Sequence, residues 1–413
     1  MIETHILYDK YKSQWVRIRD VIEGQDAIKD KGITYLPKLS GQNNEEYLSF
    51  KQRALFISIT ERIVRSNVGM ITRRNPIITK PSSMDYIFDG SINNKSFFEI
   101  FKYTVSELLQ LGRVALLVDV RENKPVILRY STESILNWYK NKKGQLIDII
   151  LKTDTIETMG ELSEISYYHL KLRNNVYSID ELDDAGTSMS TTIPTIRGKT
   201  ISYIPFICMT TTGIDIEPTK SPIINIVNIN LSHYMSSADL ENGRHYTALP
   251  TPIVTGSVAN KDLRIGSSVA WVLPDVKSKA FFLEFQGQGL LSLEKALSEK
   301  QSQMSQFNAD LMDTSTRGSE AENIVKLRHS ADATSLSDIA DIVELGLNYI
   351  YKIAALFLGE KEEVNIEIYK DFLSMKLSHA ELSALSKAYL DGSIDQQTFM
   401  YNLQRGEILK PAV

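Results

Sequence analysis

Hydrophobic residues recur at helical spacing over three long stretches in the second half of the chain. The first stretch opens with Ser221 and Pro222, a favoured N-cap followed by a favoured first helical residue. One face of each of the first two stretches is apolar, formed by Ile223, Val227, Leu231, Tyr234 and Ala238, and then by Leu293, Leu297, Met304, Phe307 and Leu311. The third opens on Ser319 and Glu322, which match a capping box. The pattern predicts helices within 221–247, 291–312 and 320–359.

The segment between the first two helices, 248–290, is made of short β-type runs separated by glycine and proline. About 40 residues bury too little area for an independent domain, so we expect this segment to complete its core against another chain. At ~1.5 Å per residue the third helix would span about 60 Å, which is more than a compact domain needs. We therefore expect this helix to cross a larger assembly.

The first 220 residues predict a mixed α+β fold. Asn43 and Asn44 can cap a helix whose apolar positions are Leu48, Leu55, Ile59 and Ile63, ending near Gly69. A second helix, at 96–111, leads through Gly112 into a strand at 114–118. Further strand-like segments lie at 125–130, 146–152, 165–172 and 201–209. Since helices and strands do not alternate regularly, the pattern favours the α+β class over α/β.

The last part of the chain predicts a short strand and two helices. Residues 364–368 resemble a strand, and the helices are joined at 391–396. Gly392 suits a C-cap, and Ser393 with Gln396 suits another capping box.

Composition is that of a globular protein with two or three cores, because 43% of 413 residues are apolar and 23% are charged. The single cysteine, Cys208, lies in an apolar run, which favours a buried, reduced thiol over a disulfide framework. The first residues lack a signal-peptide layout, and no run approaches the ~20 apolar residues of a membrane span. We expect an intracellular, soluble product.

Candidate chemistry is sparse. Residues 197–200 resemble the end of a phosphate-binding loop, but Ile193 stands where the first glycine is required, and a strand follows. The six histidines form no metal-binding spacing, and no nucleophile elbow is present. We predict no catalytic, cofactor or metal residues. The net charge of −5 argues against a protein that holds nucleic acid by neutralising phosphates.

Several motifs, taken in order, resemble the portal proteins of tailed bacteriophages. They are 35–37 with 41–42, 111–119, Pro125 through 137–138, 204–206, 221–222 with Asn228, Asn230, His233 and Tyr234, and 250–252 with Gly256. The resemblance covers nearly the whole chain. It implies a ring, usually of twelve subunits, at one vertex of the capsid.

The resemblance also implies a division of the subunit: an α/β wing at 1–220, a stem helix at 221–247, and a small α/β clip at 248–290. A return stem helix at 291–312, a tunnel loop at 313–319, a long wing helix at 320–359 and a short helical crown at 360–413 would follow. Such a ring is a channel for genome packaging and ejection, and not an enzyme. It would assemble in the host cytoplasm and reside in the virion, with no membrane partner.

The implied partners are further copies of the chain, double-stranded DNA that passes without sequence recognition, the terminase large subunit, a head–tail adaptor and the major capsid protein, with a scaffolding protein as an optional partner. We expect the tunnel loop to present Thr316, Arg317, Gly318, Ser319 and Glu320 to the channel. Clip contacts with motor or adaptor are expected at Lys261, Asp262, Arg264, Lys277 and Lys279. Two alternatives stay open: a monomeric or low-order head–tail adaptor or scaffold protein, and a soluble enzyme of unrecognised type.

Overall fold

The computed structural model describes residues 2–91, 95–121, 124–153, 167–247, 251–255, 277, 279–283, 288–307, 322–370 and 379–405. The chain divides into two compact units. The first comprises Met1–Arg19, Glu61–Asn225 and Asn308–Val413, and the second comprises Asp20–Thr60 and Ile226–Phe307. The mixture of helices with antiparallel sheets agrees with the predicted α+β class. The seven-part division of the subunit stays a prediction.

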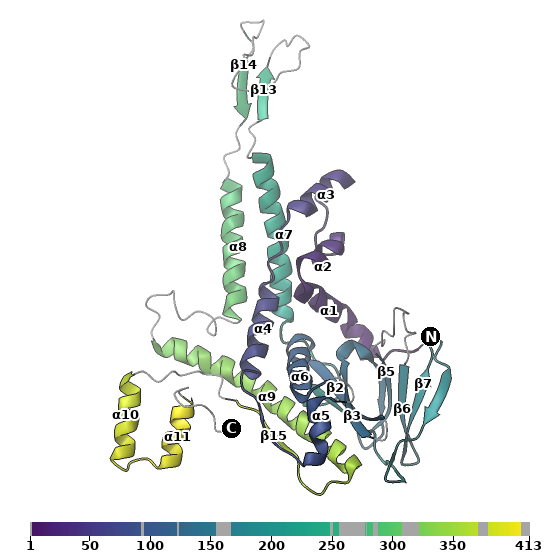
Figure 1. Cartoon of the computed structure of the whole chain (residues 1–413). Helices are drawn as coiled ribbons and strands as arrows, with labels where there is room; N and C mark the ends of the chain where they lie inside the picture. The colour runs from purple at the N-terminus through teal and green to yellow at the C-terminus, as the bar shows by residue number, and fades with distance from the viewer. Residues whose placement is uncertain are drawn as a thin grey trace. The chain divides into compact units, whose positions relative to one another are not determined.

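A four-stranded sheet forms the core of the first unit. Its order is β12 (Gly213–Ile214), β11 (Phe206–Thr210), β2 (Arg113–Arg121) and β3 (Lys124–Ser131), all antiparallel. Helices α6 (Phe97–Leu111) and α9 (Glu322–Leu358) pack against this sheet and against each other (Figure 1). Residues 113–118 of β2 are all buried. The strands predicted at 114–118, 125–130 and 201–209 are therefore confirmed, although β11 begins later than predicted.

Local signals set the start and end of α6. The Ser96 side chain accepts a hydrogen bond from Glu99 N, and the Glu99 side chain accepts one from Ser96 N, which completes a capping box. Gly112 ends the helix at φ 77°, a left-handed conformation that glycine adopts without steric cost. The prediction of a helix at 96–111 is confirmed.

A five-stranded antiparallel sheet lies in the same unit. It runs in chain order through β4 (Ile135–Lys140), β5 (Leu146–Lys152), β6 (Tyr167–Arg173), β7 (Val176–Leu182) and β8 (Ser188–Thr192). The strands predicted at 146–152 and 165–172 are confirmed, whereas β4, β7 and β8 were not predicted. A small hairpin follows, formed by β9 (Thr195–Ile196) and β10 (Lys199–Thr200).

Shorter elements complete the first unit. Strand β1 (Ile77–Thr79) pairs with β15 (Asn365–Glu367), which confirms a strand within 364–368. Asn348 of α9 holds β15, donating to Ile366 O at 2.7 Å and accepting from Ile366 N at 2.9 Å. The remaining short elements are η2 (Ser82–Met84), α5 (Asp85–Asp89) and η3 (Thr132–Ser134).

The predicted helix from 43 to 69 is wrong, because two helices occupy this region. They are α3 (Asn44–Arg53) and α4 (Ile59–Ile71), separated by 54–58, while the predicted cap at Asn43 is confirmed. Leu48 and Leu55, assigned to the buried face, are exposed. The side chain of Asn230 accounts for the break: it donates to Ile57 O at 2.9 Å and accepts from Thr60 N at 3.2 Å and from Thr60 Oγ1 at 2.9 Å.

Two antiparallel helices dominate the second unit, α7 (Ile224–Thr247, which begins at the unit boundary) and α8 (Gln288–Gln306). In sequence they flank a pair of antiparallel strands, β13 (Thr251–Thr255) and β14 (Lys279–Leu283). This order confirms the predicted plan of helix, strand-containing segment and helix. The part of the predicted β-type segment at 256–276 lies outside the described residues. Helices α2 (Gln25–Asp30) and η1 (Gly32–Thr34) belong to the same unit.

Helix α1 (Ile6–Glu23) was not predicted. The long third helix was predicted and is confirmed as α9, which comprises 37 residues.

Near the C-terminus, α10 (His379–Leu390) and α11 (Gln396–Arg405) confirm the two predicted helices. The rings of Tyr389 and Phe399 stack with their centroids 4.5 Å apart. Gly392 has φ 71°, as a C-cap requires. The predicted capping box at Ser393 is wrong, because Asp395 caps α11 by accepting from Thr398 N at 2.8 Å.

Candidate assembly surfaces and a buried polar network

Polar contacts join α7 to α8. Lys300 Nζ donates to Ser232 O at 3.1 Å and to Ser236 Oγ at 2.5 Å. Closer to the strands in sequence, Arg244 donates to Glu294 Oε1 at 2.8 Å. Since 232 pairs with 300 and 244 with 294, the two helices run antiparallel, as Figure 1 shows.

His233 lies inside this helix pair. Its side chain is buried, and Nε2 lies 3.1 Å from Gln301 Nε2. Burial lowers the pKa of His233, and the neighbouring charge of Lys300 lowers it further. Within the described part of the chain, Nδ1 has no hydrogen-bond partner. Because the Gln301 amide nitrogen can only donate, His233 Nε2 accepts its hydrogen bond. Protonation would place a second N–H against this donor and a charge beside Lys300, so the site favours the neutral ring.

Helix α8 contributes little to any core within this chain. Of its described side chains only Met304 is buried. Its outward face carries Ser292, Lys295 and Glu299, and Leu291 beside them is exposed. Because most helical stability comes from packing an apolar face, α8 is an incomplete packing unit.

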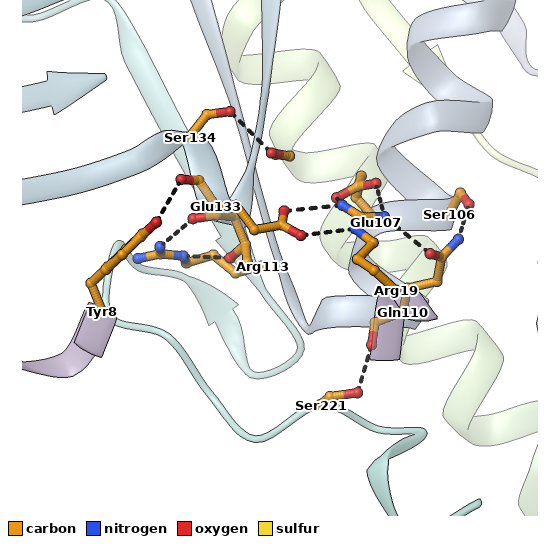
Figure 2. A network of polar contacts seen from close by, with 11 residues as sticks. Tyr8, Arg19, Ser106, Glu107, Gln110, Arg113, Glu133, Ser134 and Ser221 are labelled. Atoms are coloured by element: carbon orange, nitrogen blue, oxygen red, sulfur yellow. Dashed lines mark hydrogen bonds and ion pairs between the residues drawn. The ribbon is translucent and has the colours of Figure 1, made fainter. Parts of the chain in front are cut away.

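A partly buried polar network lies in the first unit and centres on Arg19 (Figure 2). The guanidinium of Arg19 donates to Glu107 at 2.7 and 2.9 Å and to Glu133 at 2.8 and 3.0 Å. It also donates to Gln110 Oε1 at 3.1 Å. Ser221 Oγ donates to the backbone oxygen of Gln110 at 2.6 Å. The network ties α1, α6 and η3 together.

The two carboxylates of this network have pKa values shifted in opposite directions. Burial raises the pKa of Glu107, and Arg19 only partly offsets it. Burial also acts to raise the pKa of Glu133, but the hydrogen bonds and charge of Arg19 outweigh it and the pKa is lowered. The pKa of Arg19 is raised: burial acts to lower it, and the hydrogen bonds to Glu133 and Glu107 prevail. Because one cation serves both carboxylates, the arrangement is that of an ion-pair network that positions α1.

Arg113 is fully buried next to this network. It donates to Thr132 Oγ1, Thr132 O and Ile216 O, each at 2.8 Å. The indole rings of Trp15 and Trp138 lie 5.4 and 4.9 Å from its guanidinium carbon. Burial lowers the pKa of Arg113 to about 10. The aromatic faces and carbonyl oxygens supply the negative potential that a buried cation requires.

Most of the predicted site residues lie outside the described part of the chain. Thr316, Arg317, Gly318, Ser319 and Glu320 lie outside the described residues, as do Lys261, Asp262 and Arg264. Lys277 and Lys279 are described and exposed. Lys279 begins β14 opposite Thr255, whose Oγ1 donates to Lys279 O at 3.4 Å. The two lysines thus lie within two residues of each other on the same chain segment, as the sequence dictates.

The motif at 197–200 is a hairpin turn. Arg197 and Gly198 have φ values of 52° and 79°, as the two central residues of a tight turn between β9 and β10 require. The guanidinium of Arg197 donates to Leu358 O at 2.8 Å. The prediction that a strand follows this motif is confirmed.

The cysteine and the described histidines that were considered as possible reactive or metal-binding residues instead make structural contacts. Cys208 is buried in β11, and burial raises the pKa of its thiol to about 12. The His5 ring stacks on Trp138 at 3.9 Å, and His169 Nε2 lies 3.0 Å from Asp148 Oδ1. Among the described residues no group of three or more histidine, cysteine or acidic side chains could hold a metal ion. Over the same residues, no helix has the length and apolar character needed to cross a membrane.

The model of a family described as Domain of unknown function (DUF4055) matches residues 222–358, from the start of α7 to the end of α9. No curated protein matches the chain.

Solved structures similar to the chain include those of gene transfer agent (GTA) particles. The neck of an empty GTA particle with C6 symmetry matches with a TM-score of 0.47 and 10% identity, over 87% of this chain and 91% of that chain. The virion of the native particle gives 0.47 and 11%, over 93% and 99%. The neck of the native particle with C12 symmetry gives 0.47 and 10%, over 88% and 94%. Likeness at this level does not define a shared function.

Proposed function

We propose that this chain is a subunit of a portal ring in a phage-like particle. The observation that carries the proposal is the succession of α7, the β13–β14 strands, α8 and the long α9. The portal resemblance of the sequence implies the same succession of stem helix, clip, return stem helix and long wing helix. The ring would be the channel for genome packaging and ejection.

The sparse packing of α8 supports an assembly of several copies. Polar contacts at Lys300 and Glu294 hold α8 to α7, and Met304 alone among its described side chains is buried. A helix of 19 residues held so loosely gains stability when a neighbour packs on it. A closed ring supplies such a neighbour to every subunit.

A second unpaired surface lies on α9. One face is buried in the first unit through Val343, Leu347, Ile350 and Ala354. On the opposite side Leu345, Tyr349 and Leu356 fall on one face at helical spacing, and they are 59%, 47% and 56% exposed. A helix with apolar residues on two sides is usually covered on both. We infer that this exposed stripe, Leu345, Tyr349 and Leu356, packs against a neighbouring subunit.

The partners and channel residues of the ring belong to the same proposal. The loop with Thr316, Arg317, Gly318, Ser319 and Glu320 would face double-stranded DNA. The segment that carries Lys277 and Lys279 would dock the terminase large subunit and later a head–tail adaptor. Twelve chains of charge −5 would give the ring about −60, which repels phosphate and limits adhesion of the DNA. The major capsid protein would surround the ring, in the assembled virion.

The mass of the purified assembly tests this proposal. Twelve chains of 46.7 kDa would give about 560 kDa by light scattering. A mass that stays at one or two chains over a wide range of concentration and salt would instead favour a low-order head–tail adaptor. Rings that need a scaffold would appear only when scaffolding protein is co-expressed, so both preparations are measured.

A further inference from the structure

Strand β8 is an open edge of the five-stranded sheet. It pairs with β7 on one side, and no other described segment pairs with it. All five of its residues are exposed, and Met189 is 65% exposed. Alternate backbone N–H and C=O groups of such a strand point away from the sheet and can pair with another strand.

The side chains that usually protect a sheet edge are missing from β8, although its pairing with β7 shifts register by one residue at Met189. Natural edge strands carry lysine, proline or an inward-pointing charge, whereas Ser188–Thr192 contains serine, threonine and methionine only. The opposite edge, β4, is covered by the chain itself: His5 N donates to Leu136 O at 2.9 Å, and Asn137 Nδ2 donates to Glu3 O at 3.1 Å. One edge of the sheet is therefore covered and the other is free among the described residues.

Negative charge surrounds the free edge. Asp180 and Glu181 precede it on β7, and Asp183 and Asp184 lie in the turn that leads into it. Lys171 forms an ion pair with Asp180, and Thr191 Oγ1 donates to the same carboxylate at 3.0 Å. Glu181 accepts a hydrogen bond from Ser190 Oγ at 3.2 Å. The surplus of carboxylates suits a cationic partner.

We propose that the β8 edge binds an extended, basic segment of a partner protein, which adds a sixth strand to the sheet. Backbone hydrogen bonds along Ser188–Thr192 supply the attraction, and Glu181 and Asp184 select lysine or arginine side chains on the incoming strand. Pairing of two β8 strands from two copies of this chain is disfavoured, because it would bring like charges together. The proposal does not depend on ring formation.

A peptide of ten residues with alternating threonine and lysine is the probe. Its binding to the full chain is followed by fluorescence anisotropy, and amide hydrogen exchange is followed over 188–192. We expect saturable binding and slower exchange in β8. A threonine–glutamate peptide, and a threonine–lysine peptide methylated on alternate backbone nitrogens, are each expected to bind at least tenfold more weakly.

A pair of lysine substitutions supplies the matched control. Met189→Lys adds a charge on the edge and is expected to weaken binding at least tenfold. Ile6→Lys makes the same change at a side chain that is 79% exposed on α1, and it is expected to change the affinity less than twofold. Absence of saturable binding, equal binding of the methylated peptide, or unchanged exchange at 188–192 would overturn the proposal. So would concentration-dependent protection of β8 without peptide, which would reveal pairing between copies.

Discussion

Arg19 hydrogen-bonds with both Glu107 and Glu133, residues that lie 88 and 114 positions away in the sequence. One guanidinium therefore joins α1 to α6 and to η3. The Glu107 carboxylate is almost fully buried, so its charge depends on this contact. Removing one partner from such a network lowers the free energy of unfolding by more than the network's net contribution to stability. The reason is that the remaining charges lose their compensation.

Arg19→Ala is expected to lower the free energy of unfolding by about 3 kcal/mol, since it leaves two carboxylates without their cation. Chemical denaturation monitored by tryptophan fluorescence gives the value. Lys10→Ala, at an exposed position on the same helix, is the control and should change the stability by less than about 0.5 kcal/mol. A loss below about 1 kcal/mol for Arg19→Ala would contradict the role assigned to the network.

Asn230→Leu is expected to destabilise the second unit by about 2–3 kcal/mol. The substitution removes the partner of Thr60 N, Thr60 Oγ1 and Ile57 O while keeping a similar volume, and buried polar groups left without partners are costly. Hydrogen exchange at 57–60 should accelerate at the same time. Asn228→Leu, on the exposed side of α7, is the comparison, and equal effects of the two variants would show that the Asn230 contacts are unimportant.

These two sites show what local sequence reasoning can and cannot reach. Helix α6 was predicted with its ends because Ser96, Glu99 and Gly112 act on the backbone within one turn. The break between α3 and α4 depends on Asn230, which lies 170 residues from Thr60 in the sequence. The local spacing of apolar residues carries no sign of this contact, and it therefore predicted one continuous helix.

The polar network and the edge strand escaped prediction for related reasons. Glu107 and Arg19 look like solvated helix charges until the fold brings them together. The only feature of the sequence that could have indicated this ion pair is the position of Glu107 within the apolar helix 97–111, where a buried charge needs a partner. Strand β8 has no alternation of apolar and polar residues, because both of its faces are exposed. The predicted loop residues 316–320 lie outside the described part of the chain, so that hypothesis stays a prediction.

Stability should fall with acid because of His233. Its pKa lies below 6.5 in the folded chain, so below about pH 6.5 the unfolded chain binds more protons at this site. Above that pH the ring is neutral in both states, so the free energy of unfolding does not depend on its protonation. As the pH falls further, the unfolded chain takes up the proton more readily than the folded chain, and the free energy of unfolding decreases. His233→Gln keeps a hydrogen-bonding group towards Gln301 but cannot be protonated.

The free energy of unfolding measured from pH 7.5 to 5 tests this assignment. The variant is expected to show a shallower decline than the wild type, and Lys300→Met is expected to raise the pKa of His233 towards its ordinary value, as NMR titration would show. Identical slopes for wild type and His233→Gln would contradict the assignment.

Charge reversal at the β14 segment tests the proposed docking of the motor. Lys277→Glu combined with Lys279→Glu should leave the assembly mass unchanged, because both side chains are exposed, and should weaken binding of the terminase large subunit at least tenfold. A second double variant, Lys361→Glu with Lys387→Glu, reverses two other exposed lysines and controls for the same change in net charge. Surface plasmon resonance on purified assemblies gives the affinities. Undiminished binding by the double variant would remove these lysines from the proposed contact.

The exposed stripe on α9 gives an assembly-specific prediction. Leu345→Glu with Tyr349→Glu should leave the circular dichroism spectrum of the chain intact while reducing the assembly to small species, because a charge in an apolar interface is costly. Leu390→Glu, at an exposed leucine on α10, should leave the assembly mass unchanged. Full-size assemblies of the double variant would exclude this stripe from the interface between subunits.

Rotational averages of the purified assembly, imaged by electron microscopy, test the central claim most directly. We predict closed rings with about twelve-fold symmetry and a central hole wide enough for a DNA duplex, in preparations made alone or with scaffolding protein. Particles without a hole, or with only one or two copies of the chain in both preparations, would contradict the portal proposal.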